Sequence, residues 1–107
     1  MNLRPRESYE GRARIAKALA HPSRLLILDA LNEKELCVCE LTELVGADQS
    51  TVSKHLAVLK NAGLVADRKE ASMSYYRMTC PCLDGFFRCM ESVLKQNLKT
   101  QQMVLTR

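Results

Sequence analysis

The feature of this sequence that most constrains its fold is a pair of short helical patterns joined by Gly46-Ala47. Asp48 precedes the second pattern as an N-cap, because its carboxylate can accept hydrogen bonds from the free amides of a first helical turn. Gly63 follows that pattern as a residue that ends a helix. The inward-facing residues are predicted to be Leu41, Leu44 and Val45 in the first helix and Val52, Leu56 and Leu59 in the second.

Helical patterns also occupy the chain before this pair. Residues 8–20 form one pattern, in which Ile15 and Leu19 lie four residues apart on one face. Residues 23–31 form the next, and Pro22 suits its first turn because that turn needs no amide donor. The inward side chains of this second helix are predicted to be Leu25, Leu28 and Leu31.

Two strand-like runs come next, over residues 65–68 and 74–78, and residues 69–73 join them as a hairpin. A last helix is predicted to begin near residues 81–84. Helix, glycine turn, helix and hairpin in this order make the winged helix-turn-helix motif. The fold class is therefore expected to be mainly α, with about five helices and a two-stranded β-hairpin wing in a single domain, residues 1–107.

The last helix has more apolar surface than one helix of so small a monomer needs to pack against its core. Its stripe consists of Leu83, Phe86, Phe87, Met90, Val93, Leu94 and Leu98. We expect part of this stripe to form a dimer interface, so the chain is predicted to be a homodimer.

Charge and composition narrow the function classes. The net charge of +4 is compatible with a polyanionic partner but does not by itself establish one. No apolar stretch approaches the roughly 20 residues that span a bilayer, and residues 1–14 lack the apolar core of a secretory signal. A cytoplasmic protein with no membrane partner is expected. No glycine-rich phosphate loop or nucleophile–base pattern indicates an enzyme.

The N-terminal end of the second helix of the motif is polar, and this end of a recognition helix enters the major groove of DNA. A Gln side chain can bond two edge atoms of adenine, and Ser or Thr can bond a base edge or contact a thymine methyl group. Basic side chains on the hairpin are placed to bind backbone phosphates. The predicted DNA-binding residues are Gln49, Ser50, Thr51, Ser53, Lys54 and His55 on the helix and Arg68, Lys69 and Arg77 on the wing.

Five cysteines form two pairs and a single residue: Cys37 with Cys39, Cys80 with Cys82, and Cys89. An odd count in a helical chain does not fit a disulfide framework, and clustered thiols indicate metal ligands or redox groups. Residues i and i+2 of a regular helix point about 200° apart. Cys37 and Cys39 are therefore expected to hold one small ion only if the first turn of the third helix unwinds.

Five stretches of the chain resemble the arsenical-resistance repressor family, ArsR/SmtB, in order and spacing. They are AHPSRL (20–25), ELCVCEL (35–41), QSTVSKHL (49–56), AGLV (62–65) and YYR (75–77), within about residues 15–78. The resemblance implies a winged-helix homodimer whose first and last helices form the interface. It also implies binding to operator DNA without ligand and release with ligand. The wing tip departs from the family, which often has Gly-Arg where this chain has Ala71-Ser72-Met73.

The resemblance also implies the inducer. Members that sense arsenic, antimony, cadmium or lead are similar to this chain in carrying Cys-Val-Cys at residues 37–39, so Cys37 and Cys39 are the expected ligands. The zinc-sensing branch uses His and carboxylate pairs on the last helix, but residues 83–100 contain no His. The expected function is repression of a metal(loid)-resistance operon, relieved when As(III) or Sb(III) binds these thiolates, with no organic cofactor.

Two alternatives on the same fold are a soft-metal sensor of the cadmium and lead type and a thiol redox or persulfide sensor. The cadmium and lead branch recruits further cysteines from the N-terminal arm, whereas residues 1–14 contain none. Persulfide-sensing members pair a cysteine of the second helix with one at the end of the last helix, and this chain has neither. Both alternatives therefore rank below the arsenic-sensing interpretation.

Trivalent arsenic prefers three sulfurs, and the third is expected from Cys80 or Cys82. The alternatives for these two cysteines are a second site or a cap at the start of the last helix. The arsenic branch often has its third Cys three residues past the pair, where this chain has the hard hydroxyl of Thr42. The segment before the third helix usually pairs with the last wing strand, which is expected to set residues 36–37 beside residues 76–77. Cys80 is then expected within reach of Cys37, because only a short loop separates Cys80 from this strand. Cys89 is expected to pack in the last helix.

Overall fold

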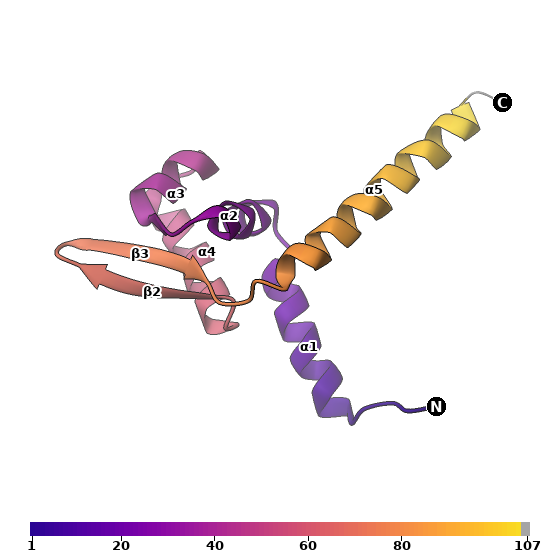
Figure 1. Cartoon of the computed structure of the whole chain (residues 1–107), viewed down its shortest axis with the longest axis horizontal. Coiled ribbons are helices and arrows are strands. Elements are labelled where there is room, and N and C mark those ends of the chain that lie inside the picture. The colour runs from indigo at the N-terminus through magenta and orange to yellow at the C-terminus, as the bar shows by residue number, and fades with distance from the viewer. Residues whose placement is uncertain (106–107) are drawn as a thin grey trace.

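The structure is a computed structural model that describes residues 1–105, which form five helices and three strands. The elements are α1 (Arg6–Leu19), α2 (Pro22–Glu33), β1 (Leu36–Cys37), α3 (Val38–Val45), α4 (Gln49–Asn61), β2 (Val65–Glu70), β3 (Met73–Met78) and α5 (Leu83–Leu105). Helices α2, α3 and α4 gather beside the hairpin, while α1 and α5 diverge from this body as two arms (Figure 1). The predicted winged helix-turn-helix fold is confirmed.

The hairpin belongs to a three-stranded antiparallel sheet with the order β1-β3-β2. Its strands are longer than predicted, so that only Ala71-Ser72 separates them, and Ala71 adopts a left-handed φ of 56°. The segment before α3 pairs with β3 as expected, and Leu36 lies opposite Tyr76. Because the pairing is antiparallel, Cys37 lies opposite Tyr75 and not beside Arg77.

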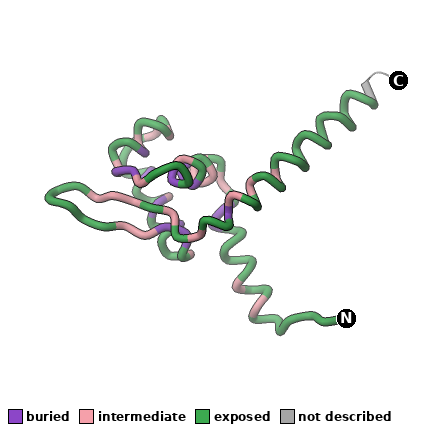
Figure 2. Tube along the Cα trace, in the orientation of Figure 1, coloured by how far each residue is buried: buried purple, intermediate pink, exposed green. Residues whose placement is uncertain are grey.

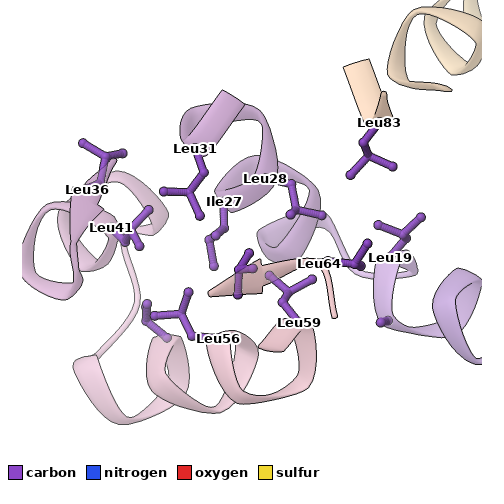
Figure 3. Close-up of a cluster of buried hydrophobic side chains, with 13 residues drawn as sticks. Leu19, Ile27, Leu28, Leu31, Leu36, Leu41, Leu56, Leu59, Leu64 and Leu83 are labelled. Carbon is purple, nitrogen blue, oxygen red and sulfur yellow. The ribbon is translucent and has the colours of Figure 1, made fainter. Parts of the chain in front are cut away.

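One apolar core holds the body together, and its side chains point inward from α2, α3, α4 and the sheet (Figure 3). Six residues of this core are fully buried: Ile27, Leu28, Leu41, Val52, Leu56 and Leu59. The inward face predicted for α4 is therefore confirmed. Ile27 is a core residue that the sequence does not predict. The apolar residues next to it fit the helical spacing equally well, so the pattern does not show which of them faces inward.

One predicted inward residue, Leu44, is wrong for the protomer, and Ile15 is exposed as well. Leu44 is 54% exposed, since α3 has eight residues and turns only the side with Leu41 fully into the core. Ile15 is 42% exposed because most of α1 runs away from the body, as does α5 (Figure 2).

The predicted helix starts are confirmed by their hydrogen bonds. Asp48 is the N-cap of α4, and its Oδ1 accepts from the Thr51 amide at 2.8 Å. Pro22 begins α2, where the preceding His21 accepts from the Ser23 amide through Nδ1 at 3.0 Å. These bonds satisfy amides that have no partner within the helix, and they set the direction in which each helix leaves its turn.

Gly46→Ala is expected to lower the free energy of unfolding by about 1 kcal/mol, because Gly46 ends α3 with a φ of +75° that an L side chain disfavours. An added Cβ has no atom within 4 Å, so backbone strain alone causes the loss. Gly11→Ala is the matched control, because Gly11 lies inside α1 and its Cβ meets only Arg14 at 3.6 Å. It should raise stability by about 0.5–1 kcal/mol. Urea unfolding at one protein concentration measures the change in the free energy of unfolding for both variants. Changes of the same sign would contradict backbone strain as the cause.

Candidate nucleic-acid interface and thiol site

Helix α4 has a buried face and an exposed polar end. Its apolar residues lie in the core, which fixes the position of the helix against α2 and α3. The predicted reading residues that are exposed are Gln49, Ser50, Thr51, Ser53 and Lys54. Ser50 donates its hydroxyl to Asp48 at 3.0 Å, so the cap also orients this side chain. The N-terminal end of α4 therefore presents short polar groups on a rigid support, as groove binding requires.

His55, the sixth predicted reading residue on α4, differs from the others because it is half-buried. Its ring lies against His21 with 4.3 Å between ring centroids. Burial lowers the pKa of His55 below its usual value, and the nearby His21 and Arg24 lower it further. The imidazole is therefore uncharged near neutral pH and packs α4 against the start of α2.

The three predicted basic residues of the wing are not equivalent. The guanidinium of Arg68 donates to Glu35 from Nε at 3.0 Å and from Nη2 at 2.6 Å, and to Glu70 at 2.7 Å. These carboxylates raise the pKa of Arg68 and balance its charge within the protomer. Lys69 and Arg77 are exposed on the same hairpin, and the strand register places them on opposite faces of it.

The thiol of Cys37 caps the helix that supports α4. Cys37 is 4% exposed, ends β1 and is the N-cap of α3. Its Sγ accepts from the Glu40 amide at 3.4 Å, while Oε1 of Glu40 accepts from the Cys37 amide at 3.1 Å. This reciprocal pair is a capping box, so the Cys37 sulfur satisfies an amide at the start of α3.

The expected geometry of the cysteine pair is corrected by this position. Cys37 has the extended dihedrals φ −82° and ψ 164° and lies outside the helix, so the 200° separation of helical residues does not apply to it and Cys39. A hydrogen bond with the Cys39 thiol and burial raise the pKa of Cys37. Cys39 is exposed. The Cys37 thiol therefore lies outside the intact helix α3, and the Cys39 thiol is open to solvent.

Glu40 is a site residue that the sequence analysis missed, although the spacing Cys-x-x-Glu is that of a capping box. The hydrogen bond from the Cys37 amide lowers the pKa of Glu40, which keeps its carboxylate ionised. Thr42 donates its hydroxyl to the Val38 carbonyl at 2.8 Å, within α3. That hydroxyl is thus engaged by the helix backbone.

The structure does not bring Cys80 and Cys82 to Cys37 within one protomer. Strand β3 passes Cys37 at Tyr75 and continues for three more residues, about 10 Å, away from it before Cys80. Among residues 1–105 no group of three or more His, Cys, Asp or Glu side chains is placed to hold one metal ion. Cys89 is exposed on α5, so the expected packing role is not seen in the protomer.

Within residues 1–105, no helix has both the length and the apolar character needed to cross a bilayer.

Comparison with known proteins identifies relatives over most of the chain. The family model described as "Bacterial regulatory protein, arsR family" matches residues 21–67. The arsenical resistance operon repressor of Staphylococcus aureus is 34% identical over 90 residues, which cover 84% of this chain and 86% of the relative. An uncharacterized HTH-type transcriptional regulator of Mycobacterium tuberculosis is 35% identical over 98 residues, covering 91% and 86%.

Solved structures agree with these relatives. NolR from Sinorhizobium fredii matches with a TM-score of 0.77 and 34% identity over 87% of this chain and 95% of that one. The homodimeric winged helix-turn-helix DNA-binding domain of Mb0332 from Mycobacterium bovis has the same TM-score at 32% identity, covering 94% and 93%. These similarities are to transcription regulators rather than enzymes. With the winged helix and its exposed reading end, they show that the chain belongs to the arsR family of bacterial regulatory proteins.

Proposed function

We propose that this chain is a homodimeric repressor of a metal(loid)-resistance operon, and that it leaves its operator when Cys37 and Cys39 bind As(III) or Sb(III). The observation that carries the proposal is the Cys37 thiol in the capping box of α3. Arsenical resistance operon repressors of Staphylococcus aureus and Staphylococcus xylosus, 34% and 40% identical to this chain, support the choice of inducer.

Ligand capture would compete with the cap. Arsenite exchanges two hydroxyls for the two thiols, and each thiol proton leaves with a hydroxyl as water. The Cys37 sulfur, once bound to arsenic, is a poorer acceptor for the Glu40 amide, which it now meets at 3.4 Å. The start of α3 then loses its cap, and α3 packs directly against α4. Loss of the cap shifts α3, which supports α4, and the movement of α4 releases the DNA. A hydroxide or a small thiol completes the third position.

The proposed dimer uses the exposed apolar side of α5. Its large exposed residues are Phe86, Val93, Leu94, Leu98 and Met103. An apolar cavity of about 370 Å³ lies between α5 and α2, lined in part by Leu26 and Leu94. The Mb0332 domain, which is homodimeric, supports a dimeric state. Two recognition helices about 34 Å apart would then enter successive major grooves of a palindromic site.

The double variant Cys37→Ser/Cys39→Ser is expected to bind the operator as the parent does but to stay bound when arsenite is added. Serine is a good N-cap, so α3 keeps its start, whereas a hydroxyl is a poor ligand for a thiophilic centre. Fluorescence anisotropy with DNA from the chain's own promoter measures both properties. Cys89→Ser is the control and should be released at the parent's arsenite concentration. Release of the double variant at that concentration would exclude this site.

Operator affinity is expected to fall by about 10³-fold or more between 50 and 200 mM salt, as it does for proteins that bind six or more phosphates. Lys69→Ala should reduce the slope of log affinity against log salt by about two, since each protomer loses one contact worth about 0.9. Arg68→Ala is the matched control and should reduce it less, because Glu35 and Glu70 already balance that charge. Equal changes in the two slopes would contradict the assignment of the wing contacts.

A further inference from the structure

We propose that Cys80 and Cys82 form a second thiol site, separate from Cys37 and Cys39, that binds trivalent arsenicals carrying one organic substituent. The two Sγ atoms lie 2.9 Å apart at the junction between β3 and α5. The site does not depend on the release mechanism proposed above, because it shares no residue with the capping box of α3.

The backbone around the pair is held before any ligand arrives. Pro81 fixes the φ angle between the two cysteines. Three successive turn bonds follow, each from an amide to the carbonyl three residues earlier. They are Leu83 to Cys80 at 3.1 Å, Asp84 to Pro81 at 3.3 Å and Gly85 to Cys82 at 3.2 Å. A ligand that joins the two sulfurs therefore orders little additional chain, which favours binding.

The junction is also tied to its surroundings on both sides. Thr79 donates its amide to the Leu64 carbonyl at 3.1 Å and its hydroxyl to the Gly63 carbonyl at 2.6 Å, just beyond the end of α4. On the other side, Asp84 accepts from Asn32 of α2 at 3.3 Å. The pair thus lies between the end of the reading helix and the start of α5.

A reagent can reach the cysteine pair from the side of Cys82. Cys82 is exposed, and Cys80 is partly buried against the core.

The short distance between the two sulfurs argues against a ligand centre that holds them on opposite sides. Metal–sulfur bonds of about 2.3 Å place two sulfurs about 4.6 Å apart in linear coordination, well beyond the 2.9 Å found here. A pyramidal trivalent centre binds two sulfurs on the same side and much closer together. Since no third ligand side chain completes a group among residues 1–105, a centre whose third position is filled by its own carbon substituent fits the pair.

The reaction is a ligand exchange without a change of oxidation state. With phenylarsine oxide as the probe, two As–S bonds form and the bonds from arsenic to oxygen break. Both thiol protons leave with that oxygen as one water molecule. Arsenic stays trivalent, and no oxidant or reductant is required.

The test uses the full chain with Cys37→Ser, Cys39→Ser and Cys89→Ser, which leaves Cys80 and Cys82 as the remaining cysteines. Titration with phenylarsine oxide under a non-thiol reductant is expected to give one phenylarsenic adduct per protomer by intact mass, removable by a small dithiol. Adding Cys82→Ser should weaken binding by about 10²-fold or more, because a two-point attachment becomes a single one. Cys82 is exposed, so this change spares the core, and circular dichroism checks the fold.

Two results would overturn the proposal: no adduct on the folded triple variant, or equal affinity after Cys82→Ser. The parent chain should take up two equivalents per protomer, and saturation at one would show that the two pairs share a single site. Operator release is not measured in this test. If the release experiment with Cys37→Ser/Cys39→Ser contradicts the proposed function, the outcome of this adduct test is therefore unaffected.

Discussion

An aspartate in place of Leu94 is expected to separate the proposed dimer and to remove operator binding at concentrations where the parent binds. Leu94 is 61% exposed in the protomer and lies on the apolar cavity between α5 and α2. In a twofold dimer each interface substitution occurs twice, and loss of a central contact costs about 2 kcal/mol or more per copy. The dissociation constant of the dimer should therefore rise by about 10³-fold.

Sedimentation velocity and operator anisotropy measure the two consequences of Leu94→Asp. Ser92→Asp provides the matched control, since Ser92 is exposed on the same helix and lies about 160° around it from Leu94. This control should remain dimeric and bind DNA. If Leu94→Asp sediments as the parent dimer and binds DNA with the parent's affinity, the apolar side of α5 is not the interface.

Leu56→Ala is expected to lower the free energy of unfolding by about 2–5 kcal/mol, the range for a buried leucine whose site cannot close completely. Leu56 is fully buried in the core, where it lies with the other inward side chains (Figure 3). The reading residues are untouched by this change. Operator affinity should therefore stay near the parent value at temperatures where the variant is folded.

Denaturant unfolding at a fixed protein concentration measures this loss, because the stability of a dimer depends on concentration. Leu44→Ala removes the same atoms from a side chain that is 54% exposed on α3 and should cost less than about 1 kcal/mol. A loss for Leu56→Ala no larger than that for Leu44→Ala would show that the core closes around the missing side chain.

Local rules were sufficient for much of the fold and for the reading end of α4. The cap at Asp48 and the left-handed glycines at residues 46 and 63 follow from interactions within one helical turn, and the structure has them where the sequence predicts them. The spacing of Val52, Leu56 and Leu59 determined which side of α4 is buried. That choice also left the polar residues 49–51, 53 and 54 exposed.

Contacts between distant residues needed the tertiary structure. Nothing in the sequence around Arg68 shows that Glu35, 33 residues earlier, accepts two hydrogen bonds from its guanidinium. The packing of His55 against His21 likewise depends on how α4 meets the start of α2. Side-chain pattern predicts which face of an element is buried, but it does not predict which partner occupies that face.

The sequence by itself determined that the thiols occur as two close pairs, and the resemblance of its motifs pointed to the first pair as a sensor. Only the tertiary structure decided that Cys80 and Cys82 lie apart from Cys37. The reason is the antiparallel register of β1 and β3, in which each step toward Cys80 is a step away from Cys37. Such a register is set by packing across the whole sheet, which no local spacing of cysteines can express.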